Sequence, residues 1–187
     1  MKKRGILGID ESNHGHFPGL IVGACSTNPL DSSMEFGLDK KRGRTDIKSL
    51  LKEKDFRYLC FTKDYLNDFN YEQMRLIAFT ELIYFFDKNL KEINLKEIII
   101  DGELAGSNVK ILEKMIPPLS PTIQIIPKAD ETYSIVNLAD QIAYSLHQYY
   151  SHFKSMKDIK KYQDYKIKIK KEYYINLFHD VSLMNLG

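Results

Sequence analysis

The sequence predicts an α/β fold in which a mixed five-stranded sheet, with three antiparallel strands and two parallel ones, is flanked by helices. Two observations support this prediction. Five short apolar runs, rich in β-branched residues, are typical of buried strands. Three of these runs follow one another without a clear helix between them, whereas helical segments precede each of the last two. Consecutive strands pair most simply as an antiparallel meander, and strand–helix–strand units add parallel strands by right-handed crossovers.

The predicted strands follow the apolar runs in chain order. The first run ends abruptly in Asp10 and Glu11, and a loop rich in turn-forming residues separates it from the second. The fourth run ends in Asp101, and Gly102 then begins a tight turn. The expected strands are 5–9, 19–25, 57–62, 97–101 and 122–127.

Helical periodicity is clearest over 70–90, where apolar residues recur as one stripe and Asn70 or Asp68 can cap the start. A second amphipathic helix is predicted over 134–150. Shorter helices are expected over 45–54 and over 109–116, the latter stopped by two prolines. The Lys- and Tyr-rich segment 154–171 is also expected to be helical.

Composition indicates one domain over 1–187, with a Lys-rich helical extension from about residue 151. A formal net charge of +2 excludes a global polycation, so that any nucleic-acid surface must be local. Cys25 and Cys60 lie in apolar runs and suit buried thiols better than a disulfide or a zinc site. No apolar run approaches the roughly 18 residues that span a bilayer, and no apolar signal core precedes Asp10. We therefore expect a cytoplasmic protein that does not bind membranes.

Carboxylates mark the ends of two predicted strands. Successive strand residues point to opposite faces, so Asp10 and Glu11 should diverge. If the first and fourth strands are neighbours, Asp10 meets Asp101, and the helix over 134–150 can bring Asp140 to the same place. Acids at such a position suffer desolvation and mutual repulsion, which a divalent cation would offset. The alternative is a solvated strand-to-turn junction.

Several short sequence motifs, in consistent order over about the first 150 residues, resemble motifs of ribonuclease HII. The first is Gly8-Ile9-Asp10-Glu11, followed by a proline-containing turn and an apolar strand; the others are Leu38-Asp39-Lys40-Lys41, Ile100-Asp101-Gly102 and Lys128-Ala129-Asp130 with the helix after it. The resemblance implies a ribonuclease H fold. It further implies a nuclease that hydrolyses phosphodiester bonds in RNA or an RNA–DNA hybrid with two Mg²⁺ or Mn²⁺ ions about 4 Å apart.

By the same resemblance, Asp10 bridges the two ions, and Glu11, Asp101 and a fourth carboxylate complete the ligand set. Ribonuclease HII favours Asp130 as the fourth. A largely uncharacterised group of the same fold, with a D-E-S start and an L-A-D-x-x-A helix, is also similar to this chain and favours Asp140. An aspartate on an amphipathic helix beside its buried stripe is the harder one to explain structurally, so we expect Asp140, with Asp130 as the alternative.

Ser12-Asn13-His14 stands where the family has the first two residues of its G-R-G turn, so we expect no strict preference for a ribonucleotide junction. Basic residues that can hold the nucleic acid are His14, Lys40, Lys41, Arg42, Arg44 and Lys128. Tyrosines of the C-terminal segment are candidates for stacking on bases, namely Tyr162, Tyr165 and Tyr173. Two alternatives stay open: a non-catalytic nucleic-acid-binding protein of this fold, and a hydrolase of another phosphoester.

Overall fold

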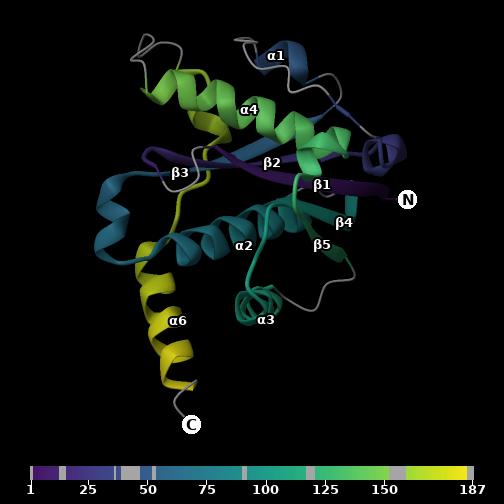
Figure 1. Cartoon of the computed structure of the whole chain (residues 1–187). Helices are drawn as coiled ribbons and strands as arrows, with labels where there is room; N and C mark the ends of the chain where they lie inside the picture. Colours follow the sequence, from purple (N-terminus) through teal and green to yellow (C-terminus); the bar gives the residue numbers. More distant parts are fainter. Residues whose placement is uncertain are drawn as a thin grey trace.

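The computed structural model contains one mixed sheet of five strands with helices on both faces (Figure 1). It describes residues 2–12, 16–35, 37–38, 47–51, 54–89, 92–116, 121–151 and 159–184. The strand order is β3-β2-β1-β4-β5; β1 pairs antiparallel with β2 and β2 with β3, while β4 lies parallel to β1 and to β5. The predicted mixed sheet is confirmed. The strands are β1 (Lys3–Ser12), β2 (Gly19–Ser26), β3 (Asp55–Phe61), β4 (Ile93–Asp101) and β5 (Thr122–Ile126).

Two apolar cores, one on each face of the sheet, hold the layers together. On one face, α2 (Tyr71–Asn89) packs with α3 (Gly106–Met115) and α6 (Lys171–Met184). On the other face, α4 (Ser134–Ser151) packs with the short α1 (Ile47–Leu50). β1 lies at the centre of the sheet, and side chains that alternate along it enter the two cores in turn, with Leu7 and Ile9 facing α2. The residues that follow Ile9 therefore reach opposite faces of the sheet.

Local signals explain the helices. Asn70 Oδ1 accepts from the backbone N–H of Gln73, and Gln73 Oε1 accepts from that of Asn70, each at 2.9 Å. This reciprocal pair is a capping box, and it confirms Asn70 as the residue that starts α2. The helices predicted over 70–90, 109–116 and 134–150 are confirmed as α2, α3 and α4. Among the residues that the structure describes, no helix is long and apolar enough to cross a membrane.

The helix predicted over 154–171 is wrong for residues 161–170, whereas residues 159 and 160 are helical. A 3₁₀ turn, Gln163–Tyr165, leads into an extended stretch, and α6 begins only at Lys171. Ile167 and Ile169 alternate with lysines and pack against the core, and the Ile167 N–H donates to the Tyr58 carbonyl at 2.9 Å. Period-two burial therefore outweighs the helix propensity of the lysines.

The tyrosines of this segment differ in their exposure. Tyr162 is buried and offers no free ring face, whereas the half-buried Tyr165 stacks one face of its ring on Phe56, with 4.5 Å between ring centroids. Tyr173 on α6 is 59% exposed. The predicted stacking role is therefore wrong for Tyr162 in this structure, and stays a prediction for Tyr165 and Tyr173.

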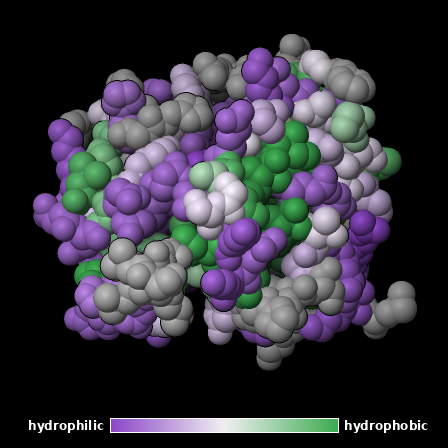
Figure 2. Space-filling model, turned by 60° about the horizontal axis from the view of Figure 1, so that its bottom comes forward, coloured by the Kyte–Doolittle hydropathy of each residue, from purple (hydrophilic) through white to green (hydrophobic). Residues whose placement is uncertain are grey.

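The helices on the α2 face leave part of the apolar surface near the solvent. Figure 2 shows this side, with hydrophobic residues gathered in the middle and polar ones around them. Half-buried apolar side chains of α3 and β5 pack here against the core, namely Ile111, Met115, Ile123 and Ile125.

Cys25 and Cys60 are free and buried within the sheet, as predicted, and burial raises the pKa of both thiols.

A buried carboxylate outside the sheet connects three elements. Asp31 is 6% exposed and accepts hydrogen bonds from Ser26 at the end of β2, from Lys54 Nζ at 3.0 Å before β3, and from Ser134 at 3.0 Å at the start of α4. Burial by itself raises the pKa of Asp31. The three hydrogen bonds and the Lys54 charge outweigh that effect and lower it below the usual value.

We expect Asp31→Asn to lower the free energy of unfolding by about 2 kcal/mol at pH 7. A depressed native pKa contributes stability above the unfolded value of about 4, and this contribution is lost as the pH falls through the native pKa. The difference in the free energy of unfolding between wild type and variant is the gap to be measured, and it should therefore narrow below about pH 4 in urea titrations. Asp164→Asn, at an exposed position, should show no such gap. A gap independent of pH would contradict the assignment.

Candidate metal centre

Asp10 lies near the end of β1, on the side of the sheet that α4 covers. It is 5% exposed, and its Oδ1 accepts a hydrogen bond from the Glu11 backbone N–H at 2.6 Å. The preceding Ile9 belongs to the core on the α2 face, so the alternation of the strand turns Asp10 toward α4. A carboxylate is thereby placed within the packed layer between sheet and helix.

Two further aspartates reach Asp10 from the chain that follows β5. Lys128, in the left-handed conformation with φ 58°, turns the chain into the 3₁₀ segment Ala129–Glu131, which carries Asp130. Asn137 Nδ2 donates to the Asp130 carbonyl at 2.9 Å and fixes this turn on α4. Asp140 comes from the second turn of α4.

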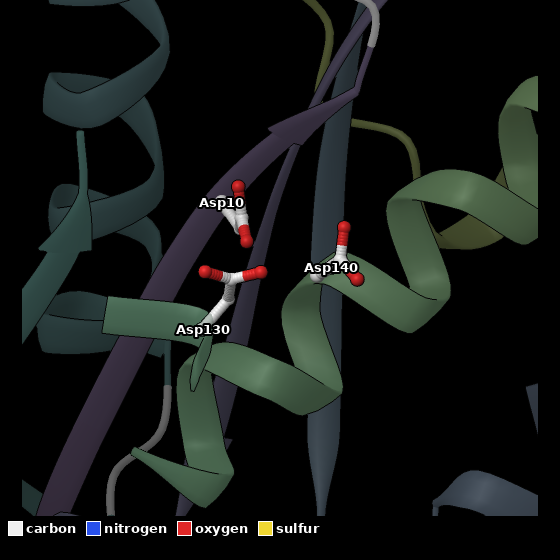
Figure 3. A group of neighbouring side chains, drawn as sticks. All are labelled: Asp10, Asp130 and Asp140. Carbon is white, nitrogen blue, oxygen red and sulfur yellow. The ribbon is translucent and has the colours of Figure 1, made fainter. Parts of the chain in front are cut away.

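The carboxylates of Asp10, Asp130 and Asp140 each offer an oxygen such that these atoms all lie within 4.8 Å of one another. Figure 3 shows the carboxylates of Asp10 and Asp130 directed toward each other, with Asp140 beside them on α4. Burial raises the pKa of Asp10 well above its usual range, and the charges of Asp101, Asp140 and Asp130 raise it further. Clustered oxygens of this kind are the ligands that hard divalent cations prefer.

Asp101 ends β4 next to the cluster. The parallel register pairs Ile9 with Ile100, so the next residues of the two strands, Asp10 and Asp101, come level on the same face. Of the neighbouring charges, that of Asp101 has the largest effect on the pKa of Asp10. The predicted meeting of the first and fourth strands at these two acids therefore agrees with the structure, although Asp101 is not one of the three residues within 4.8 Å.

Glu11 lies on the other face of the sheet, as the alternation of the strand predicts. Its Oε2 is 3.3 Å from Nε of Arg75 on α2, and both side chains are largely buried. The structure therefore does not bring Glu11 into the group around Asp10. Its role as a metal ligand stays a prediction. Sequence reasoning did not find Arg75, although it shares the apolar stripe of α2 with Ala78, Phe79 and Leu82, which is an unusual place for an arginine.

Most of the predicted nucleic-acid contacts lie outside the described residues, namely His14, Lys40, Lys41, Arg42 and Arg44. The structure does describe the residues that precede and follow the basic stretch, 37–38 and 47–51. Before it, the Leu38 N–H donates to the Glu131 carbonyl at 3.1 Å, one residue beyond Asp130; after it, Ile47 is fully buried. Lys128 is exposed two residues before Asp130.

Solved structures share this arrangement of strands and helices. Ribonuclease H2 from Pyrococcus horikoshii aligns over 91% of this chain and 87% of its own, with a TM-score of 0.55 and 15% identity. Ribonuclease HII from Archaeoglobus fulgidus, solved in complex with PCNA, aligns over 95% and 89%, with a TM-score of 0.56 and 15% identity. The chain has a ribonuclease H-like fold. The resemblance noted in the sequence is confirmed at this level.

A mutant of Bst-RNase HIII has the same ribonuclease H-like fold, with a TM-score of 0.61 and 13% identity over 78% of this chain and 52% of that protein. No protein-family model matches the chain, and no curated protein is significantly similar to it in sequence. In this chain the ribonuclease H-like fold carries an aspartate cluster where its central strand ends, and a fold by itself does not determine which chemistry such a cluster performs.

Proposed function

We propose that this protein is a nuclease that depends on Mg²⁺ or Mn²⁺ and hydrolyses phosphodiester bonds in RNA or an RNA–DNA hybrid. The observation that supports this most is the three-aspartate cluster, within 4.8 Å, where the central strand of a ribonuclease H-like fold ends. The similar structures are named as ribonucleases, which supports an RNA-containing substrate.

The donor set fits a divalent metal. Three carboxylates in a buried layer repel one another when ionised, and burial and these charges together raise the pKa of Asp10. Asp10, Asp130 and Asp140 would hold an ion, and Asp101 lies where it would serve a second one. When bound, such ions activate water and stabilise the charge that develops on the phosphate and the leaving oxygen.

Other features of the chain would position the Asp10 carboxylate and the substrate. Asp10 is fixed by the Glu11 N–H and by burial, so its oxygens stay directed at the cluster. Lys128 is exposed, two residues before Asp130, and would contact a phosphate of the substrate. The basic residues Lys40, Lys41, Arg42 and Arg44 would contact the nucleic-acid backbone.

Cleavage of matched duplexes tests the proposal. The substrates are all-DNA, an RNA–DNA hybrid and DNA with one ribonucleotide, each with Mg²⁺ or Mn²⁺ and at several salt concentrations. We expect cleavage of the hybrid without strong selectivity for the single ribonucleotide, because Ser12-Asn13-His14 offers fewer fixed donors than an arginine in that turn. Cleavage that persists in Asp10→Asn would indicate a contaminant. Binding of these duplexes without any cleavage would favour a non-catalytic nucleic-acid-binding protein. Activity on simple phosphoesters only would favour a hydrolase of another phosphoester.

Asp130 and Asp140 are the two candidates for the fourth carboxylate, and the proposal that both bind the ion is supported by carboxylate oxygens that lie within 4.8 Å of Asp10 and of each other. We expect Asp130→Asn and Asp140→Asn each to weaken Mn²⁺ binding by about tenfold or more in calorimetry. Asp164→Asn is the exposed control and should bind as wild type does. A loss in only one of the two variants would identify that aspartate as the ligand. Unchanged affinity in both would contradict the proposed centre.

A further inference from the structure

Arg75 is a residue of α2. Its side chain lies next to the ends of β1 and β4, on the face of the sheet opposite the aspartate cluster. Its side chain is only 7% exposed. A guanidinium is permanently charged, so its burial is costly unless charged and hydrogen-bonding partners surround it. Such partners come here from three separate elements.

Each edge of the guanidinium has a different neighbour. Nε lies 3.3 Å from Glu11 Oε2 at the end of β1. Nη1 donates to the Glu103 carbonyl at 2.9 Å, just after β4, and to the Glu72 carboxylate at 3.1 Å in the first turn of α2. The group also lies over the Phe79 ring, 5.5 Å from its centroid. One side chain thus joins the ends of the two strands to the helix.

The turn after β4 is shaped around this contact. Gly102 has φ +100°, and a Cβ on it would lie 3.3 Å from Arg75 Nη2. On the other side, the Gly102 N–H donates to the Ile126 carbonyl of β5 at 3.1 Å. The turn that carries Asp101 is therefore held from both sides, and glycine suits both its conformation and the space left by Arg75.

The residues that Arg75 holds directly adjoin the cluster. Glu11 follows Asp10, and Glu103 is two residues after Asp101. The charges of Asp10 and Asp101 repel each other, which pushes the ends of β1 and β4 apart. A rigid fork that bonds both strand ends from the opposite face opposes this separation.

We propose that Arg75 is a positioning residue that sets the spacing of Asp10 and Asp101 for metal binding, and that Glu11 acts through Arg75 and is not itself a metal ligand. The inference rests on the proposed function, because it assumes that the aspartates hold a divalent ion. It assigns to Glu11 a role different from the one that the resemblance to ribonuclease HII implies.

A double-mutant cycle on Mn²⁺ affinity, measured by calorimetry, tests both parts. Arg75→Met should weaken Mn²⁺ binding about 10- to 100-fold, as outer-shell substitutions do, and Arg75→Lys should weaken it less. Glu11→Gln should weaken binding in the wild-type background and add nothing in the Arg75→Met background. A direct ligand would instead lose affinity in both backgrounds. Asp31→Asn is the control: it removes a buried ion pair elsewhere and should lower the melting temperature without changing Mn²⁺ affinity.

Unchanged affinity in a folded Arg75→Met protein would overturn the positioning role. An equal loss from Glu11→Gln in both backgrounds would overturn the role assigned to Glu11. If Arg75→Met does not fold, Arg75→Lys decides, because an ammonium cannot reproduce the fork, and unchanged affinity there overturns the proposal. Absence of Mn²⁺ binding in the wild type would overturn the proposed function as well, which separates that failure from the others.

Discussion

Asp10→Asn is expected to abolish cleavage while making the metal-free protein more stable. Loss of the central carboxylate should reduce the cleavage rate at least about a thousandfold, equivalent to about 4 kcal/mol in the barrier. At the same time, asparagine can still accept the Glu11 N–H, and it removes a buried charge from among three others. We expect the melting temperature without metal at pH 7 to rise by about 3 °C, for roughly 1 kcal/mol.

The raised pKa of Asp10 determines how the stability of the metal-free protein changes with pH. The pKa of Asp10 is raised in the native state, so between the unfolded value and the native one the folded protein binds more protons. The stability of the metal-free wild type should therefore fall as the pH rises through that window. The stability of the Asp10→Asn variant should fall less steeply over the same window. Thermal melts from pH 4 to 8 in a chelator measure this effect. A variant that is less stable than wild type at pH 7 would contradict the electrostatic argument.

Added Mn²⁺ supplies the second half of the test. An ion that binds only the folded state raises the melting temperature in proportion to the logarithm of its concentration. This rise should appear in the wild type and be absent in Asp10→Asn. An equal rise in both proteins would mean that the ion binds elsewhere.

Of the glycines that the structure describes, Gly8 is the one at which substitution by alanine is expected to cause the largest loss of stability. A Cβ on Gly8 would lie 2.7 Å from both the carbonyl carbon and the oxygen of Ile135, and 2.8 Å from the Val136 nitrogen. These are backbone atoms of the first turn of α4, so no side chain can rotate away. We expect a loss of about 3 kcal/mol, which lowers the melting temperature by roughly 6–12 °C.

The same substitution should affect the metal centre, because α4 carries Asp140 and must retreat from β1 to admit the methyl group. Two other glycines provide matched controls. Gly23→Ala meets only side chains, at 3.1 Å or more, and should cost less. Gly106→Ala meets nothing within 4 Å at the start of α3, and should be neutral or slightly stabilising. A loss at Gly8 no larger than that at Gly23 would show that the helix is not held so close to the strand.

Much of the fold was predictable from the sequence because its signals are local. Burial on both faces makes β1 and β4 continuous apolar runs, and the capping box at Asn70 with a regular apolar stripe marks α2. Three strands in succession followed by strand–helix–strand units leave few topologies, so the mixed sheet followed from the order of elements alone. The period of two along β1 also predicted that Asp10 and Glu11 would face opposite sides.

Other features depended on contacts between residues far apart in the sequence. The sequence offered Asp130 and Asp140 as alternatives, whereas the close approach of α4 to Gly8 brings both to Asp10. The burial of Ile167 and Ile169 overrides the helical propensity of their lysine-rich segment. Local patterns specify which residues form a strand or a helix and which face is buried. Only packing decides which charges share a buried layer, because desolvation and like-charge repulsion depend on distances that the sequence does not contain.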